Sequence, residues 1–339
     1  MTVHSRAPLR IDFAGGWSDV PDFADGEGGT VVNAAIRLHV HVDFVLGGKT
    51  IRLHAADLRE HVTIKSASEI VYGGKLDLHA AALRMLPVTG GIEIISCSEA
   101  PAGSGLGGSG ALDVALLAGL ARCRHDQYDR EELAELGFLL ETSELHLAGG
   151  RQDQYAAALG GFHKLDFQNG AVSALRLSIP AAATDDLAKH IVLIYTGHTH
   201  FSSQTHSRVW QAYDDGDPRV VEAIREIRDV ARMAGDVLEA GNWRRLAELI
   251  DENWRCQQRL DGTMATPVTR TIEGAIRQAG AWGLKATGAG AGGCLVALCP
   301  PEVRGVVVDA ATAAGGTVLP CEFTTDGVTV WEEESDDDG

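Results

Sequence analysis

The sequence has little positive charge: 29 Lys and Arg residues stand against 47 Asp and Glu residues, so the formal net charge is −18. A nucleic-acid-binding protein needs Lys and Arg to replace the counterions of the phosphates, and this balance excludes such a partner. The six cysteines form no Cys-x-x-Cys pair, which argues against a zinc ribbon or a thioredoxin-like site. No apolar run approaches the roughly 18 residues of a membrane-spanning helix, and residues 1–10 lack the apolar core of a signal peptide. We therefore expect a reduced, cytoplasmic protein with neither a membrane nor a nucleic-acid partner.

Glycine is what the chain has in excess. There are 40 glycines among 339 residues, almost twice the usual share of about 7%. Hydrophobic residues make up 45% and charged residues 22%, which is typical of a globular chain that can bury a core without disulfides. The length corresponds to about two domains. Six acidic residues among the last eight predict a disordered acidic tail over residues 332–339.

Strand-like and helix-like patterns follow one another in mixed order, which predicts an α+β fold. Apolar and polar residues alternate over 29–46 as in a half-buried strand. The expected strands are 29–46, 91–96, 161–167, 171–178, 190–195, 293–299, 304–309 and 327–331, with one more inside 3–20 that ends in a glycine turn. The expected helices are 111–122, 130–147, 218–240, 242–260 and 267–280. Small and polar residues at 181–186 predict a linker, which divides the chain into domains 1–183 and 184–331 ahead of the tail.

A glycine-rich loop at residues 101–110 leads directly into the helix at 111–122. Glycines let the backbone approach a bulky anion, and the free N–H groups and dipole of the helix start attract phosphate. A Walker A loop is excluded because Gly108 is followed by Ser109 and no Lys. A dinucleotide-binding loop matches formally through Gly103, Gly105 and Gly108, but residues 98–101 separate it from its strand. A flexible turn is the remaining alternative.

The same loop resembles the phosphate-binding motif of the GHMP kinases, Pro-x-x-x-Gly-Leu-Gly-x-Ser-x-Ala, with Gly110 where many members have Ser or Ala. The resemblance implies that the loop backbone holds the phosphates of ATP and that the Ser109 hydroxyl is a ligand of Mg²⁺. The ATP-binding residues it implies here are Pro101, Gly103, Ser104, Gly105, Leu106, Gly107, Gly108 and Ser109.

A second motif lies near the N-terminus. Residues 7–19, which end in Gly-Gly-Trp-Ser-Asp, resemble the sugar-binding motif of the galactokinase branch. They are closest to the version found in heptose 7-phosphate kinases and L-fucokinases. The resemblance implies that Asp19 accepts hydrogen bonds from sugar hydroxyls and that Arg10 sits beside the catalytic aspartate. Gly16, Trp17 and Ser18 are the further substrate-binding candidates. Without the other motifs, Asp19 reads as a turn residue and Trp17 as a core residue as readily as a platform for a sugar.

Two further segments extend the resemblance. Residues 285–294 resemble the C-terminal glycine-rich loop of the family, which implies nucleotide contacts from Gly288 and Gly290. Residues 149–155 resemble the catalytic loop of the galactokinase branch. They imply Asp153 as the base or orienting group and Gly150 and Arg151 as substrate-binding residues. The acid twelve residues before Asp153 is Glu141, which falls where the family places its magnesium carboxylate; Glu144 is the fallback.

The resemblance covers residues 6 to about 299. It implies a two-domain GHMP kinase fold, with an N-terminal domain like domain 2 of ribosomal protein S5 and a ferredoxin-like C-terminal domain. The implied activity is an ATP- and Mg²⁺-dependent sugar kinase that phosphorylates the anomeric hydroxyl of a heptose 7-phosphate or fucose-like substrate. A cyclitol or other small alcohol as acceptor, and a catalytically silent sugar sensor, are the alternatives. An NAD-linked oxidoreductase is disfavoured because residues 123–126, which follow the helix, read as a loop without the acidic strand end it requires. The oligomeric state stays open.

Histidine positions bear on the substrate and on metals. His200 stands where the subgroup usually has an Arg, which favours an unphosphorylated sugar unless Arg151, Arg208 or Lys164 compensates. His39, His41 and Asp43, and likewise His198, His200 and His206, also suggest transition-metal sites. Sequence spacing alone cannot show that such side chains converge, and exposed or hydrogen-bonded histidines are the default expectation.

Overall fold

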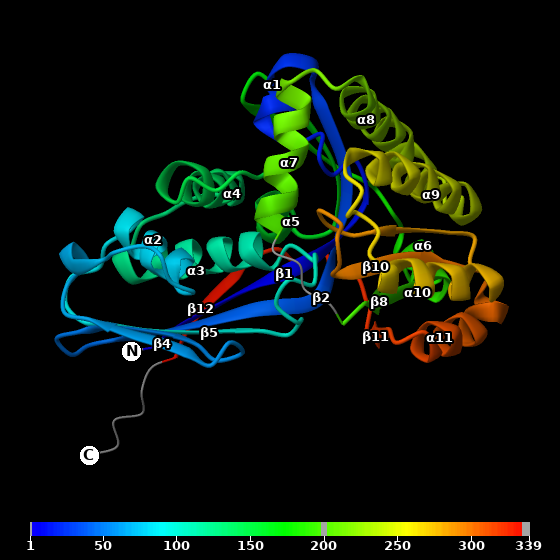
Figure 1. The fold of residues 1–339 in the computed structure, drawn as a ribbon. Coiled ribbons are helices and arrows are strands. Elements are labelled where there is room, and N and C mark those ends of the chain that lie inside the picture. The colour runs from blue at the N-terminus through cyan, green and yellow to red at the C-terminus, as the bar shows by residue number, and fades with distance from the viewer. Residues whose placement is uncertain (1, 198–201, 334–339) are drawn as a thin grey trace.

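The computed structural model describes residues 2–197 and 202–333. Two mainly antiparallel sheets and the helices packed on them form this part of the chain, which confirms the α+β prediction (Figure 1).

The larger sheet has eight strands in the order β12-β1-β2-β5-β3-β4, and β6 joins it by pairing with β2 and β7. Its strands are β1 (Thr2–Ala14), β2 (Gly29–Leu46), β3 (Ile51–Ala55), β4 (Glu60–Ile64), β5 (Ile92–Ser98), β6 (Phe162–Gln168), β7 (Ala171–Arg176) and β12 (Thr329–Glu333). Only the β3–β5 pair is parallel. The 18-residue β2 is the central strand of the sheet. Its first third pairs with β6, its last third pairs with β5, and most of its length pairs with β1.

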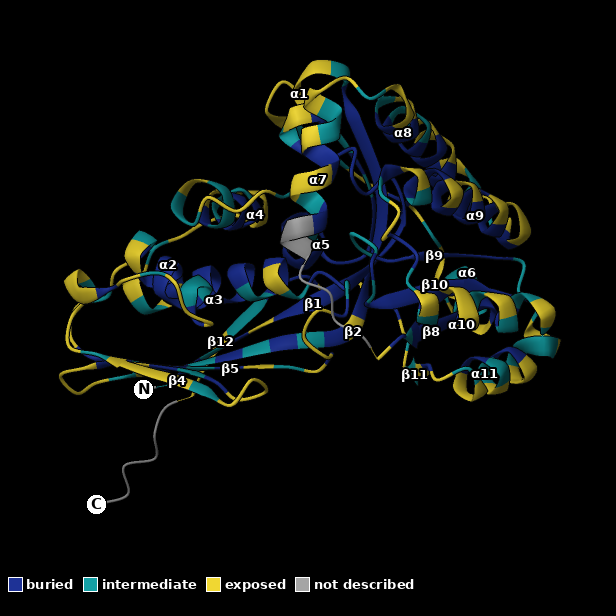
Figure 2. Ribbon diagram, in the orientation of Figure 1, coloured by how far each residue is buried: buried dark blue, intermediate teal, exposed yellow. Residues whose placement is uncertain are grey.

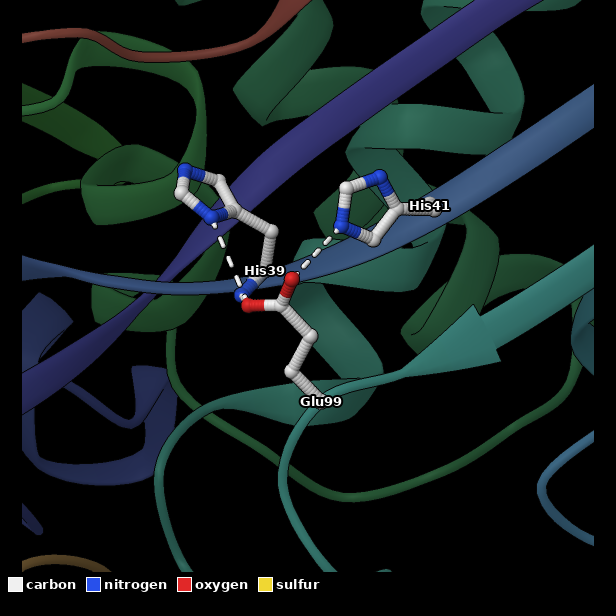
Figure 3. A group of neighbouring side chains, drawn as sticks. All are labelled: His39, His41 and Glu99. Atoms are coloured by element: carbon white, nitrogen blue, oxygen red, sulfur yellow. Dashed lines mark hydrogen bonds and ion pairs between the residues drawn. The ribbon is translucent and has the colours of Figure 1, made fainter. Parts of the chain in front are cut away.

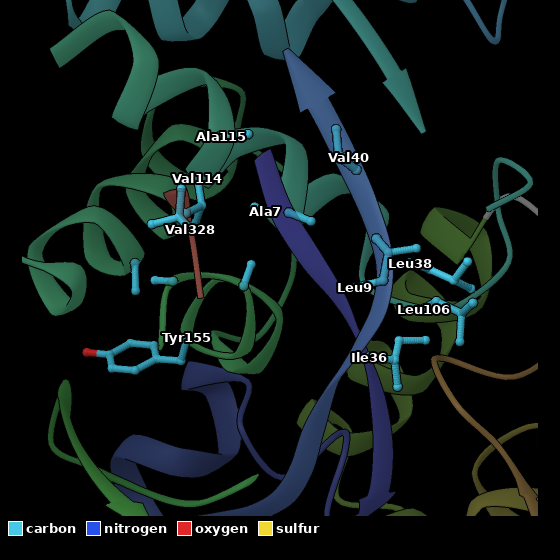
Figure 4. Packing of buried hydrophobic residues seen from close by; sticks show 14 of the residues in the cluster. Ala7, Leu9, Ile36, Leu38, Val40, Leu106, Val114, Ala115, Tyr155 and Val328 are labelled. Atoms are coloured by element: carbon cyan, nitrogen blue, oxygen red, sulfur yellow. The ribbon is translucent and has the colours of Figure 1, made fainter. Parts of the chain in front are cut away.

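Helices close one face of this sheet and supply the walls of a core. They are α1 (Pro21–Glu27), α2 (Asp77–Met85), α3 (Gly108–Arg124), α4 (Arg130–Leu139) and α5 (Gln152–Leu159), with a short turn η1 (Ala67–Glu69). Helix α3 is apolar on nearly every side and is buried along most of its length (Figure 2). Val114 and Ala115 of α3 pack into the same cluster as Ala7 of β1 and Val40 of β2 (Figure 4).

The smaller sheet has the antiparallel order β11-β8-β10-β9. Its strands are β8 (Ile191–Tyr195), β9 (Gly283–Ala286), β10 (Cys294–Leu298) and β11 (Thr317–Leu319). The helices of this half are α6 (Ala181–His190), α7 (Ser202–Asp214), α8 (Pro218–Glu239), α9 (Trp243–Leu260), α10 (Pro267–Gln278) and α11 (Arg304–Ala313), with a short turn η3 (Pro301–Val303). Helices α10 and α11 lie beside the small sheet (Figure 1). Helix α8 packs on α9 and on β1 and β2, whereas α9 contacts β9 and β10 of the small sheet as well as β1.

Three segments differ from the sequence predictions. Residues 181–186 form the start of α6 and not a linker, because three alanines favour a helix and Leu187 is buried beneath it. Residues 304–309 form α11 and not a strand, since Val307 and Ala311 are buried four residues apart on one helical face. The helix expected over 130–147 ends at Leu139, where a wider π-type turn, η2 (Leu140–Glu144), redirects the chain.

Both ends of the described chain lie in the larger sheet. Strand β12 pairs with β1 from Arg6 opposite Thr329 to Thr2 opposite Glu333. It therefore enters the segment predicted as an acidic tail, and the Glu332 carboxylate lies 2.6 Å from Nε of Arg122. Residues 334–339 lie outside the described residues, and the domain division at residue 183 stays a prediction. No helix in the described ranges combines the length and apolar character needed to cross a membrane.

Candidate active site

A cavity of about 1090 Å³ opens where the end of β1, the loop before α3 and the loop before α5 meet. It collects residues from all the sequence motifs. Of the predicted site residues, those that line it are Arg10, Gly16, Trp17, Asp19, Pro101, Gly103, Ser104, Gly105, Gly107, Gly108, Ser109, Glu141, Gly150, Asp153, Gly288 and Gly290.

The glycine-rich loop ends at the start of α3. Gly107 is the residue before the helix and has φ 76°, a left-handed conformation in which a side chain would be strained. The first bond of the helix runs from the N–H of Ala111 to the carbonyl of Gly107, at 3.0 Å. The N–H groups of the first turn therefore have no partner within the helix, and together with the dipole of a 17-residue helix they suit an anion.

Arg10 holds the centre of the site together. Its Nε lies 2.7 Å from Oδ1 of Asp153, and Nη2 lies at the same distance from that oxygen. Its Nη1 donates to the carbonyls of Gly105 (2.6 Å) and Thr287 (2.8 Å), so one guanidinium ties three segments together. The Arg10 side chain is 5% exposed and that of Asp153 is 26% exposed, which leaves the carboxylate accessible from the cavity.

Asp19 lies deep in the same wall. Its Oδ2 accepts the N–H of Gln152 at 3.2 Å. Burial, reinforced by the charges of Asp153 and Asp12, raises the pKa of Asp19 to about 6. A Cβ on Gly150 would fall 1.9 Å from Oδ2 of Asp19, so only glycine permits this approach. Asp19 and Asp153 thus face one region from two neighbouring segments, as the sequence predicts.

Ser109 and Glu141, the predicted magnesium ligands, both line the cavity, and the nearby Ser109 side chain acts to lower the pKa of Glu141 against the larger effect of burial. Glu141 lies on the π-type turn η2 and accepts from Nε2 of Gln154 at 3.0 Å. Asp113, one turn after Ser109 on α3, is fully buried, and its carboxyl interacts with that of Glu141. Burial raises the pKa of both Glu141 and Asp113, and neither oxygen of Asp113 has a donor among the described residues. Oxygen donors crowded in this way suit a hard divalent cation such as Mg²⁺.

The second half of the chain closes the site with the loop that follows β9. The Thr287 hydroxyl donates to the carbonyl of Gly105 at 2.9 Å, and Nε2 of Gln257 donates to the carbonyl of Gly288 at 2.8 Å. Beneath this loop, Nζ of Lys285 lies 2.7 Å from Oδ2 of Asp12, and both side chains are buried. The two glycine-rich loops are therefore held against each other from both sides.

Trp17 forms part of the cavity wall and is also part of a core cluster. Its ring stacks on that of His206, with centroids 4.4 Å apart. Nε1 of Trp17 and Nδ1 of His206 are buried and have no hydrogen-bond partner among the residues that the structure describes. Burial lowers the pKa of His206 to about 4, so its ring is neutral. The wall thus includes the stacked rings of Trp17 and His206.

Some predicted residues do not reach the cavity. Arg151 was expected to bind substrate, but it lies over the ring of Phe138 at 4.3 Å and donates to the carbonyl of Gly170. Ser18 is buried, and its hydroxyl bonds the carbonyls of Gly15 in the glycine turn and of Thr30 on β2. The Leu106 side chain is in the core, although its carbonyl accepts the N–H of Arg10. Glu144 lines the cavity, but it bonds Tyr72 and faces Arg84, away from Ser109.

The proposed substitutes for the missing arginine are also elsewhere. Arg208 is held by Asp261 and Thr263, and Lys164 packs against Gly235 of α8. His198 and His200 lie outside the described residues.

Sequence reasoning missed one residue and two long-range contacts at the site. Asp113 had a signal, since it is the one carboxylate in the otherwise apolar 111–122 segment. The Asp12–Lys285 pair joins positions 273 residues apart, and the contact of His206 with Trp17 also depends on the tertiary fold. No local pattern could have revealed either.

Comparison with known proteins gives the same picture. The model of the GHMP kinases N terminal domain matches residues 70–161, and that of the GHMP kinases C terminal domain matches residues 221–316. The D-glycero-alpha-D-manno-heptose 7-phosphate kinase of Campylobacter jejuni is 28% identical over 97% of this chain and 99% of its own length. A mevalonate kinase of Pyrococcus horikoshii is 30% identical over 71% of this chain and 69% of its own length.

Among solved structures, a D-glycero-D-manno-heptose 1-phosphate kinase of Bacteroides thetaiotaomicron superposes with a TM-score of 0.82 at 28% identity. The match covers 98% of this chain and 100% of that one. Sequence models in both halves and a superposition along nearly the whole chain agree with the resemblance of the motifs. The chain therefore belongs to the GHMP kinase family and is an ATP-dependent phosphotransferase with an alcohol group as acceptor.

Proposed function

We propose that this kinase transfers the γ-phosphate of ATP to the anomeric hydroxyl of a sugar and so produces a sugar 1-phosphate. The observation that carries the proposal is the Arg10–Asp153 pair, which stands between the phosphate loop and Asp19. An acceptor hydroxyl held by Asp19 beside Asp153 would face the phosphates bound at the start of α3. This is the in-line arrangement that phosphoryl transfer requires.

Each group has a distinct task in this proposal. The N–H groups at the start of α3 hold the phosphates, and the guanidinium of Arg10 balances charge on the phosphoryl group in transfer. Asp153 accepts a hydrogen bond from the sugar hydroxyl and orients it. It takes the hydroxyl proton as the bond between the sugar oxygen and the γ-phosphorus forms and the bond between that phosphorus and ADP breaks, so that ADP leaves. Ser109 and Glu141 would hold Mg²⁺, which supplies positive charge to the phosphate oxygens. Trp17 would stack on the apolar face of the sugar ring.

The described wall favours a sugar without a phosphate group. Arg10 and Lys75 are the Lys and Arg residues on the described part of the lining, and both already have acidic partners, Asp153 and Glu60. A phosphorylated sugar would want a free guanidinium. The names of the two relatives place the phosphate at different positions, since one is called a heptose 7-phosphate kinase and the other a heptose 1-phosphate kinase. The names therefore do not decide the substrate of this chain. A fucose-like or unphosphorylated heptose substrate fits the described residues best.

An ADP-release assay with Mg-ATP tests the proposal across L-fucose, free heptoses, heptose 7-phosphate and cyclitols. ³¹P NMR of the product identifies the hydroxyl, because an anomeric phosphate couples to the proton on C1. We expect turnover on at least one free sugar that is lost in Asp153→Asn. ADP release that no acceptor stimulates above this variant would overturn the proposal and favour a sugar-binding sensor.

A further inference from the structure

A group of side chains that the phosphoryl transfer does not use lies on the larger sheet, on the face opposite the cavity. His39 and His41 are two residues apart on β2, so their rings project from the same face. Glu99 directly follows β5, and its N–H donates to the carbonyl of His39 at 3.0 Å. One ligand atom from each of the three residues lies within 4.8 Å of the others (Figure 3).

We propose that His39, His41 and Glu99 bind a divalent transition-metal ion such as Zn²⁺. Two imidazoles and one carboxylate are a ligand set that zinc takes in proteins, with water in the fourth position. The site is at the surface, where His41 is 40% and Glu99 is 42% exposed, so an ion and its water can enter.

The distances agree with this ligand set. Zinc bonds of about 2.1 Å in a tetrahedron put neighbouring ligand atoms about 3.4 Å apart. Nε2 of His41 lies 3.0 Å from Oε1 of Glu99, and Nδ1 of His39 lies 3.6 Å from Oε2. The two nitrogens approach different oxygens of the Glu99 carboxylate, so side-chain rotations are needed to bring the three ligands around one ion.

The carboxylate is held in place before an ion binds. The backbone N–H of His39 donates to Oε2 of Glu99 at 2.8 Å. Hydrogen bonds of this kind orient metal ligands and strengthen binding. Asp43, the third ligand considered from sequence spacing, bonds His4 instead at 2.7 Å and does not join the group.

Two neighbours modify the site. Arg6 stands opposite His41 on β1 and is a competing cation, but its guanidinium lies over the ring of Trp331 and bonds Thr329. Cys97 stands opposite His41 on β5 and is also among the residues that line the cavity. Its thiol is exposed and could replace the water as the fourth ligand after a rotamer change.

The site is separate from the cavity yet joined to it through the backbone. Val40, between the two histidines, lines the cavity on the other face of β2. Glu99 lies two residues before Pro101, where the phosphate loop begins. An ion held by Glu99 would therefore fix the base of that loop against β2.

Titration of Zn²⁺ into the metal-free protein without nucleotide, against a chromogenic zinc chelator, tests the proposal. We expect one ion bound per chain and a Kd raised at least ~10-fold by Glu99→Gln or His41→Ala. His61→Ala is the matched control. His61 of β4 stacks on His54 of β3, and Glu93 lies beside His54, so the surroundings are similar. His61 does not belong to the three-ligand group. This variant should bind zinc as the wild type does.

A second set of measurements locates the ion. Glu141→Gln reports on zinc at the active-site carboxyls and should leave the tight binding unchanged, and anomalous scattering from a zinc-soaked crystal should peak at His41 and Glu99. Zinc affinity lowered by Glu141→Gln but unchanged by Glu99→Gln would overturn the proposal, as would no binding by the wild type. Circular dichroism of the metal-free variants confirms that each is folded.

Discussion

Asp19 carries a stability cost that depends on pH. Its pKa is about 6 in the folded chain against an ordinary value of 3.8. A carboxyl that holds its proton more tightly in the folded state makes the free energy of unfolding fall as pH rises from about 3.8 to about 6, and the full loss persists above that range. A difference of one pKa unit between the folded and the unfolded state corresponds to about 1.36 kcal/mol. The difference of about two units for Asp19 therefore lowers the free energy of unfolding by about 3 kcal/mol at neutral pH.

The variant Asp19→Asn removes this cost because an amide does not titrate. Its carbonyl oxygen can still accept the N–H of Gln152. Its NH₂ group needs a new partner in a buried place, which costs about 1–2 kcal/mol. We therefore expect the variant to be about 1–2 kcal/mol more stable than the wild type at pH 7.5 and no more stable at pH 4.

Urea unfolding without ligand at the two pH values measures this difference. Asp309→Asn, on the exposed side of α11, is the matched control and should change stability little at either pH. Asp19→Asn should also raise the KM for the sugar at least ~10-fold, because the Asn side chain accepts weaker hydrogen bonds than a carboxylate does. A stability change that is equal at pH 4 and pH 7.5 would refute the argument from burial.

Three further variants test the remaining groups. Asp153→Ala should lower kcat at least ~10²-fold with little change in ATP affinity. Single-turnover kinetics measure the rate of phosphoryl transfer, and a nucleotide-binding assay measures the ATP affinity. Turnover within a few-fold of wild type would contradict the role of Asp153 as the base. Ser109→Ala should raise the Mg²⁺ concentration for half-maximal rate, whereas Glu144→Gln, whose carboxylate is turned to Tyr72, should not; an equal response would rule out Ser109 as a ligand. Lys285→Met leaves the Asp12 carboxylate buried without its cation and should cost about 3–5 kcal/mol of stability, with partial recovery when Asp12→Asn is added. A cost below ~1 kcal/mol in urea unfolding would contradict a stabilising role for the Asp12–Lys285 pair.

The sequence predicted the fold class, the family and the part of the cavity wall that the motifs supply, because each motif is a short contiguous segment. In residues 101–110 the glycines, the serine and the helix that follows are neighbours in the chain, so the local pattern already contains the geometry. The catalytic loop was harder. Arg151 lies next to Gly150 and Gln152, but it immediately precedes α5 and its side chain leaves on the side of Phe138. Neighbouring residues in this loop point their side chains in different directions, and the spacing of residues in the sequence does not reveal which of them faces the cavity.

The remaining differences come from tertiary packing. The run of valines in α11 has strand propensity, yet burial against α10 and β8 selects the helix. The helix expected over 130–147 ends early, and the π-type turn that replaces its second half is what brings Glu141 to Ser109. Wider turns of this kind often occur at functional sites. Here the departure from a regular α-helix occurs at Glu141, the predicted magnesium ligand.

The pairing of β12 with β1 has a consequence for how the protein can be divided. The chain leaves the larger sheet after β7 and returns to it only at its last strand. A fragment that stops near residue 183 would leave the edge of β1, a 13-residue strand, without its partner. Such an edge presents unpaired N–H and C=O groups and promotes association between copies. Neither half is thus a self-sufficient unit for expression, and a deletion or fusion at the C-terminus has to spare residues 329–333.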